Sequence, residues 1–308
     1  MMKTPDFYQP ERVGTLYQPD IAAATAEGIQ RQFRPADQDD RRILLLLVDA
    51  QVDFVHEDGA LSVPGAVEDT RRTIEWLFRN TGRVTSIVAS LDSHTPIHIF
   101  YPTWWVDRQG NRPEPFTTIS LESVEKGTWK PLFEKSWSLD YVRALQEQAK
   151  KDLMIWPYHT MIGTPGHALT PAVYEAIAFH AGARQTTPEF VIKGTIGKTE
   201  FYSILEPEVK ASDDSRGVLN QELLDRLLSY DAVYIAGQAK SHCVLETVTS
   251  VVRRYGDQPE IVGKFHLLTD CTSSVSHPEI DFERMAKEAF ARFEAQGLKL
   301  ARSVDPLS

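Results

Sequence analysis

The feature that most constrains the fold is an uninterrupted apolar run early in the chain, RILLLLV from Arg42 to Val48. Such a run of branched side chains is typical of a central strand buried on both faces, as in parallel sheets. Further strands are predicted at 84–91, 190–193, 232–236 and 263–269, and helices at 67–79, 139–150, 172–181, 219–229, beyond Ser241 and at 280–294. This alternation predicts an α/β fold: a doubly wound, mainly parallel sheet flanked by helices in a Rossmann-like three-layer sandwich.

Two segments stand apart from this alternation. Residues 1–40 are polar and contain four well-separated prolines, which predicts an extended arm lying on the body or on a partner subunit. Residues 99–155 hold four tryptophans among several prolines and indicate an insertion. Because each tryptophan can bury a large surface area, we expect this insertion to pack against the rest of the protein, over the mouth of its ligand pocket. The predicted organisation is an arm at 1–40 and one domain at 41–308 that contains the insertion.

Composition excludes several classes of function. The chain has 308 residues, with 33 basic and 43 acidic side chains and a net charge of −10. Because the basic residues are dispersed, neither nucleic acid nor a membrane is an expected partner. The sequence has two cysteines, and its first residues lack the apolar core of a secretory signal. We therefore expect a protein of the reducing cytoplasm.

Chemically active side chains follow four of the predicted strands. They are Asp49, Asp92, Lys193 and Cys243. In open parallel sheets the ligand site lies beyond the carboxyl ends of the strands, so these groups are expected to converge. A carboxylate, a cation and a thiol are the groups that thiol-based amide hydrolysis needs. Taken singly, each acid could be a loop anchor and the lysine a surface charge; only the combination favours catalysis.

Cys243 falls where the predicted strand 232–236 gives way to a helix, with Ser241 as a plausible N-cap. In the first turn of a helix, free backbone N–H groups and the helix dipole favour a thiolate and can donate to an oxyanion. A buried structural cysteine is the common alternative for a single thiol. This stretch alone leaves both interpretations open.

A second cluster is predicted from the segment DSHTPIH, which contains Asp92, His94 and His98, and from His159 farther along the chain. One carboxylate with two or three imidazoles is a donor set for an open, catalytic metal site. Histidines that cap turns or bond backbone groups are the alternative, because a short D-x-H motif often occurs without a metal.

Six motifs, spread over about residues 42–300, resemble in sequence and order those of nicotinamidases in the isochorismatase-like cysteine hydrolase superfamily. They are VDAQVDF, LDSHTPIH, WPYHTMIGTPG, VIKG, EFYS and GQAKSHCV. The chain departs from the family pattern at Ser93, where an aromatic residue is usual, and at Lys240 and Ser241, where Thr-Asp is usual. About 57 residues separate His98 from Trp156, more than compact members have.

The resemblance implies roles for the strand-end residues. Cys243 would be the nucleophile, Asp49 the catalytic acid and Lys193 the catalytic lysine. The backbone N–H groups of Ala239 and Cys243 would form the oxyanion hole. A cis peptide bond is expected between Gln238 and Ala239.

The resemblance also implies a substrate pocket and a metal site. The pocket would be lined by Phe54, Trp156 and Tyr202, with the tryptophan stacked on a pyridine ring. The metal ligands would be Asp92, His94 and His159. Zinc is the first expectation for the divalent ion, with iron or manganese as alternatives, and His98 is either a further ligand or a neighbour of the site.

The predicted activity is hydrolysis of nicotinamide to nicotinate and ammonia through a cysteine thioester, a step of NAD salvage. One alternative is a related cysteine hydrolase for another small ureido, carbamoyl or heteroaromatic amide. The other is a non-catalytic interaction protein on the same fold, with the arm and the insertion as its binding surface. The expected partners are the small-molecule amide and further copies of the chain in a homo-oligomer.

Overall fold

The computed structural model describes residues 4–149 and 151–307 of the chain. Within these residues, the main sheet has six parallel strands in the order β10-β9-β8-β1-β2-β7. The strands are β1 (Ile43–Val48), β2 (Ser86–Asp92), β7 (Glu189–Lys193), β8 (Ala232–Gly237), β9 (Phe265–Leu268) and β10 (Lys299–Ala301). The predicted parallel α/β sheet is confirmed, with β10 as an edge strand that the sequence did not indicate.

Strand β1 lies at the centre of the sheet, and its composition explains why. Leu44 pairs with Ser86 of β2 on one side and with Val233 of β8 on the other. Alternate side chains enter two different cores: Leu45 packs on one face of the sheet and Leu46 on the other. Because neither face meets water, every position of the strand is apolar.

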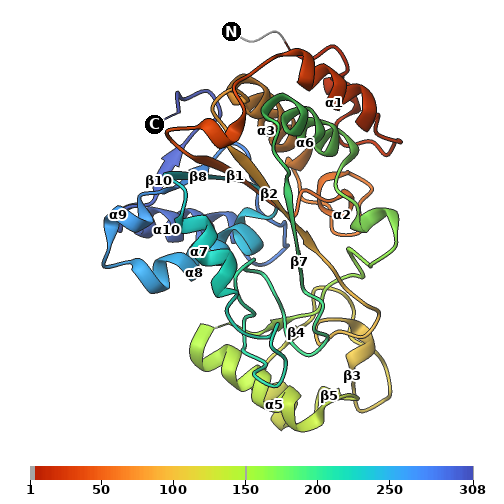
Figure 1. The fold of residues 1–308 in the computed structure, drawn as a ribbon. Helices are drawn as coiled ribbons and strands as arrows, with labels where there is room; N and C mark the ends of the chain where they lie inside the picture. Colours follow the sequence, from red (N-terminus) through yellow and green to blue (C-terminus); the bar gives the residue numbers. More distant parts are fainter. Residues whose placement is uncertain (1–3, 150, 308) are drawn as a thin grey trace.

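Helices cover both faces of the sheet (Figure 1). On the face of Leu45 lie α3 (Ala66–Asn80) and α6 (Pro171–Arg184). On the face of Leu46 lie α7 (Gln221–Leu228), α8 (Leu245–Tyr255) and α10 (Phe282–Glu294). Short helices α2 (Val52–Val55) and α9 (Pro259–Val262) complete the body. The three-layer sandwich is therefore as predicted.

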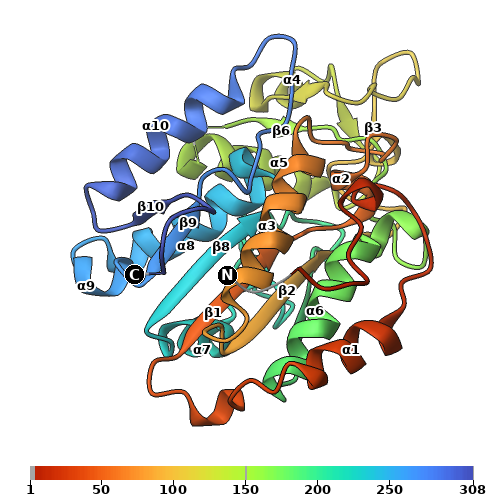
Figure 2. The ribbon, with the colours of Figure 1, turned by 90° about the horizontal axis from the view of Figure 1, so that it is seen from above.

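The N-terminal segment is not extended throughout. It contains a helix, α1 (Ile21–Gln30), which lies alongside α6 on the outside of the helical layer (Figure 2). Asp20 caps the helix by accepting from the N–H of Ala23, and Gly28 allows the backbones of α1 and α6 to come into close contact. The prolines lie outside this helix, so they did not prevent it from forming.

The insertion forms a lobe beyond the carboxyl ends of the strands (Figure 1). It contains α4 (Leu121–Glu125), α5 (Lys135–Ala144), a π-helical turn at Leu145–Ala149 and two small antiparallel ladders, β3–β5 and β4–β6. The strands are β3 (Trp105–Val106), β4 (Thr118–Ile119), β5 (Lys130–Pro131) and β6 (Leu153–Met154). Trp104 and Trp105 are buried, and Trp129 and Trp137 pack against the same cluster. The expectation that these tryptophans pack is confirmed.

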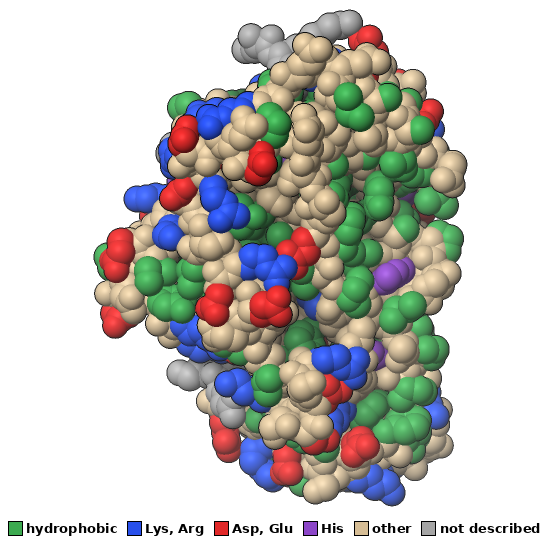
Figure 3. All heavy atoms as spheres, in the orientation of Figure 1, with side chains coloured by type: hydrophobic (Ala, Val, Ile, Leu, Met, Phe, Trp, Pro, Cys, Tyr) green, Lys and Arg blue, Asp and Glu red, His purple; other side chains and the backbone are tan. Residues whose placement is uncertain are grey.

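Charged side chains of both signs are interspersed over the face shown in Figure 3. Across residues 4–149 and 151–307, no helix is both long and apolar enough to cross a bilayer.

We expect one buried ion pair to anchor the N-terminal segment. Arg184 of α6 is fully buried, lies 2.5 and 2.6 Å from the two carboxylate oxygens of Asp39, and also bonds the carbonyl of Gly82. Arg184→Met should lower the free energy of unfolding by about 3 kcal/mol, because it leaves the largely buried carboxylate without its cation. Urea denaturation followed by tryptophan fluorescence measures this loss.

Arg34→Met is the control for this substitution. Arg34 pairs with Asp40 at 3.1 Å, but both side chains are exposed. Its removal should change the free energy of unfolding by less than about 0.5 kcal/mol. Equal losses in the two variants would contradict the anchoring role of Arg184.

Candidate active site

Four predicted site residues meet at the carboxyl edge of the sheet. Asp49 follows β1, Asp92 ends β2, Lys193 ends β7 and Cys243 follows β8. All four side chains are buried. The convergence expected from strand order is therefore present, because β8, β1, β2 and β7 are neighbours in the sheet.

Lys193 lies at the centre of this cluster. Its Nζ is 2.9 Å from Asp49 Oδ2 and 2.8 Å from Asp92 Oδ1. The same atom donates to the carbonyl of Phe201 at 2.8 Å and lies 3.6 Å from Cys243 Sγ. One ammonium group thus contacts the thiol and both carboxylates, and it links the cysteine to the predicted metal cluster.

The pKa values of Asp49 and Asp92 are shifted in opposite directions by their surroundings. Burial raises the pKa of Asp49, although the nearby Lys193 opposes this shift. Burial also acts to raise the pKa of Asp92, but His94 and Lys193 outweigh it and hold the pKa well below its ordinary value. For Lys193, burial is outweighed by Asp49 and Asp92, which raise its pKa. Asp49 is therefore the better proton acceptor of the two acids.

Asp49 is held by its backbone and by a serine. Its φ of 45° turns the chain sharply out of β1, which directs the carboxylate to the sheet edge. Ser90 Oγ accepts from the backbone N–H of Asp49 and donates to its Oδ1 at 2.6 Å. This contact leaves Oδ2 facing Lys193.

Cys243 lies in a π-helical turn, Lys240–Val244, which leads into α8. The predicted N-cap role of Ser241 is wrong: its Oγ accepts from the backbone N–H of Val275 and bonds the His242 ring, because the 273–283 loop packs against the turn. The cis peptide bond between Gln238 and Ala239 is present, as the resemblance implied.

The thiol is the resting form of Cys243. Burial raises its pKa well above the ordinary value, and the opposing effect of Lys193 does not overcome it. Burial thus opposes the thiolate that the start of the helix was expected to favour. Asp49 and Cys243 contact the same ammonium group, Lys193 Nζ.

The predicted metal ligands also come together. Asp92, His94 and His159 each place one ligand atom within 4.8 Å of the others. Asp92 Oδ2 lies 2.7 Å from His94 Nε2 and 3.7 Å from His159 Nε2. The Nδ1 atoms of the two rings contact the carbonyls of Gly194 and Pro157 at 3.0 and 2.7 Å. This outer contact fixes each ring with Nε2 toward the carboxylate, an arrangement typical of metal-binding histidines.

His98 is a buried neighbour of this cluster. Its ring lies 4.8 Å from the His94 ring, and neither of its nitrogens has a hydrogen-bond partner within the described residues. Burial lowers the pKa of His98 to about 2, so the ring is neutral. A neutral imidazole with a free lone pair beside Asp92 and His94 fits the donor set of a divalent ion.

The predicted substrate residues lie in one packed cluster. Phe54 of α2 meets the His159 ring at 5.5 Å, and Trp156 donates its indole N–H to Tyr202 Oη at 3.0 Å. Tyr202 in turn donates to Glu200 at 2.5 Å. Because its N–H is engaged, Trp156 has only its ring face for contact with a substrate.

Several residues that shape the site were not predicted. Gln51 connects the ends of two strands, since its side chain bonds both the N–H and the carbonyl of Asp92. It stands inside the VDAQVDF motif, which was the available signal. Glu200 also receives a hydrogen bond from Tyr141 Oη of α5 at 3.0 Å, a contact across 59 residues that no local pattern indicates.

Comparisons with known proteins support the fold. The nicotinamidase and pyrazinamidase structure from Acinetobacter baumanii matches with a TM-score of 0.56 and 20% identity over 88% of this chain and 100% of that chain. The yeast nicotinamidase bound to the inhibitor nicotinaldehyde matches with a TM-score of 0.57 and 19% identity, covering 84% and 99%. No family model matches the chain, and no curated protein matches its sequence. This chain thus has the three-layer α/β fold of these solved nicotinamidases, and the resemblance is confirmed at the level of fold.

Proposed function

We propose that this protein is an amidohydrolase that cleaves a small carboxamide through a thioester on Cys243. The observation that carries the proposal is the contact of one buried ammonium, Lys193 Nζ, with Cys243 Sγ at 3.6 Å and Asp49 Oδ2 at 2.9 Å. A thiol, a base of raised pKa and a fixed cation are together the parts that acyl transfer to sulfur requires.

The reaction begins with transfer of the thiol proton from Cys243 to Asp49, while Lys193 stabilises the sulfur anion. Sulfur then forms a bond to the amide carbon, and the carbonyl electrons move to oxygen, where the N–H groups of Ala239 and Cys243 would donate. The C–N bond breaks, and the nitrogen leaves as ammonia with the proton from Asp49.

The second half regenerates the enzyme. A water molecule gives a proton to Asp49 and adds to the thioester carbonyl. The C–S bond breaks, the acid is released, and the proton on Asp49 returns to Cys243. Lys193 stays charged throughout, so it stabilises the sulfur anion in both halves.

Nicotinamide is the substrate we propose, giving nicotinate and ammonia in NAD salvage. The ring face of Trp156 suits a flat heteroaromatic ring, and the indole N–H of Trp156 is held by Tyr202. The yeast structure named above holds nicotinaldehyde, which has the same ring as nicotinamide. A flat ring against Trp156 would direct its carboxamide to Cys243.

Asp92, His94 and His159 would hold a divalent cation, with His98 as a further neighbour. Such a cation would polarise and orient a ring nitrogen of the substrate. Zinc suits one carboxylate with imidazoles, and iron or manganese are the alternatives.

Two rival functions are separable by one assay. If the true substrate is another ureido, carbamoyl or heteroaromatic amide, the ranking of substrates would differ, but ammonia release would still depend on Cys243. A non-catalytic interaction protein would release no ammonia from any of them. Purified protein incubated with nicotinamide, pyrazinamide, N-carbamoyl compounds and ureidoacrylate distinguishes the three. The cytoplasmic location and the homo-oligomeric state stay predictions.

Cys243→Ala should lower kcat/KM for nicotinamide by at least about a thousandfold, because the covalent route is removed. Cys271→Ala is the matched control, since Cys271 is also buried but contacts Asp270 rather than the catalytic lysine. This control should keep most of the activity. Substantial turnover by Cys243→Ala would contradict the thioester mechanism.

The acid limb of the pH profile should reflect Asp49. Asp49 must be ionised to accept the thiol proton, and burial raises its pKa above 3.8. Activity should therefore begin to fall, on acidification, at a higher pH than an ordinary aspartate would impose. The measurement is kcat/KM between pH 4 and 8, with circular dichroism at each pH. A folded protein with full activity down to pH 4 would exclude Asp49 as the base.

Purified protein should contain about one divalent metal per chain by elemental analysis. His159→Ala should lose most of it, whereas His167→Asn should keep it, because His167 Nε2 bonds Ser93 Oγ instead of facing Asp92. Burial lowers the pKa of His159, so the metal should be retained at pH 6.5 and released under more acidic conditions. A metal-free wild-type protein purified without chelators would contradict the site.

A further inference from the structure

The loop between β9 and α10 lies directly against the turn that carries Cys243. We call residues 273–283 the cap segment. Two backbone contacts tie its start to the catalytic turn: Lys240 donates its N–H to the Ser273 carbonyl at 2.8 Å, and Val275 donates to Ser241 Oγ at 3.1 Å. The cap segment is thus joined to the two residues that precede His242 and Cys243.

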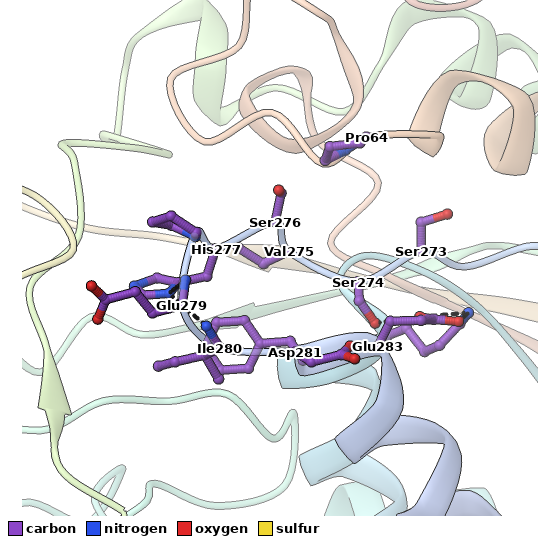
Figure 4. A pocket seen from close by; sticks show the side chains of 13 residues that line it. Pro64, Ser273, Ser274, Val275, Ser276, His277, Glu279, Ile280, Asp281 and Glu283 are labelled. Atoms are coloured by element: carbon purple, nitrogen blue, oxygen red, sulfur yellow. Dashed lines mark hydrogen bonds and ion pairs between the residues drawn. The ribbon is translucent and has the colours of Figure 1, made fainter.

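The far end of the cap segment is held by charge. Lys240 Nζ lies 2.9 and 3.1 Å from the two carboxylate oxygens of Glu283. Ser274 Oγ donates to the same carboxylate at 2.7 Å, and Figure 4 shows these two cap residues side by side. One lysine of the catalytic turn therefore contacts both ends of the cap segment.

Between these attachments the cap segment contacts the body through apolar side chains, Ile280 and Phe282, and makes few hydrogen bonds to it. Among the described residues from Ser276 to Asp281, the hydrogen bonds stay within the segment or reach only the start of α10. His277 Nδ1, for example, accepts from the N–H groups of Glu279 and Ile280, both at 3.1 Å. Within the described part of the chain, the residues from Ser276 to Ile280 make no hydrogen bond to the main sheet or to the insertion.

The inner side of the cap segment closes a ring of aromatic side chains. The successive ring centroids are 4.8 to 6.1 Å apart. The members, in order, are Phe116, Trp156, His242, Phe282 and His277. Phe116 comes from the insertion, His277 and Phe282 from the cap segment, and the other two from the body. The insertion therefore contributes one of the five rings, Phe116, and the cap segment contributes two.

The residues next to this ring are buried. Cys243 is only 6% exposed, and Trp156 and Tyr202 lie within the same packed cluster as Val275 of the cap segment. A cavity of about 530 Å³ is lined by the cap segment together with Pro64 and Lys240 (Figure 4). His277 and Phe282 line this cavity and also belong to the aromatic ring, so these two side chains connect the cavity wall with His242 and Phe116.

We propose that the cap segment is the entrance gate of the cysteine site, that Lys240 and Ser241 hold it closed, and that His277 and Phe282 decide which amides pass. The cavity lined by the cap segment would then receive the substrate before the gate opens. An ion pair near the surface is weak enough to break and re-form at each turnover. The gate rests on the proposed function only in taking Cys243 as the reacting group.

The test measures access to Cys243 without any substrate. Wild-type protein and variants are treated with iodoacetamide and with the larger N-ethylmaleimide, and modification of Cys243 is followed by mass spectrometry. Both reagents need the thiolate, so the ratio of their rates reports access rather than acidity. Lys240→Met should raise the rate with N-ethylmaleimide roughly three- to tenfold, and more than the rate with iodoacetamide.

Lys287→Met is the matched control. Lys287 also pairs with Glu283, at 3.2 Å, but it belongs to α10 and does not contact the catalytic turn. Its rates should stay within about twofold of wild type. Glu283→Gln provides a second way to open the gate if Lys240→Met does not fold. The double variant Lys240→Glu with Glu283→Lys should return the rates toward wild type, because it restores the pair with reversed charges.

The selectivity of the gate is tested with Phe282→Ala. This variant should raise kcat/KM for amides with larger rings relative to nicotinamide by about tenfold, because the smaller side chain widens the passage. Unchanged alkylation in both Lys240→Met and Glu283→Gln would overturn the gate. If alkylation changes as expected but no amide is hydrolysed, the gate stands and the proposed function fails.

Discussion

The site depends on one buried ammonium group placed between two buried carboxylates. Lys193 reaches Asp49 and Asp92 at 2.9 and 2.8 Å from the end of β7, and the three residues follow or end neighbouring strands. Without that cation, two carboxylates would face each other out of contact with water, which is strongly unfavourable. The parallel order β1-β2-β7 makes the arrangement possible, because it brings three strand ends to one edge. The catalytic cluster and the metal cluster are consequently parts of one charge network.

The other neighbours of the two acids give them different pKa shifts. Asp92 also faces the imidazoles of His94 and His159, and its pKa is held low, as a metal ligand requires. Asp49 has only Lys193 and Ser90 to offset its burial, and its pKa is raised, as a base for a thiol requires. The pKa values of Asp49 and Asp92 therefore differ because the two carboxylates have different neighbours. The raised pKa of Cys243 completes the scheme, since the thiol remains protonated until a base accepts its proton.

Burial of the site comes from parts of the chain that are remote in sequence. Phe116 of the insertion and Phe282 at the start of α10 meet in one aromatic ring beside Trp156. Exclusion of water strengthens the interactions among the charged groups beneath, because the effective dielectric constant falls. It also requires a path for substrate, and the proposed gate at the cap segment offers that path. The insertion contributes support, through the hydrogen bond from Tyr141 to Glu200, as well as cover.

The sequence by itself determined five of the six strands of the main sheet, the helices that flank it and the edge at which the candidate site lies. Runs such as that from Ile43 to Val48 are local signals, and the residue after each run is fixed once strand direction is known. Tertiary structure decided what those residues became. Ser241 holds a distant loop instead of capping a helix, and burial raises the pKa of Cys243, which the start of the helix was expected to lower. Apolar periodicity is a local property of a few consecutive residues. Desolvation and hydrogen-bond partners, in contrast, are set by segments that meet only in the folded chain.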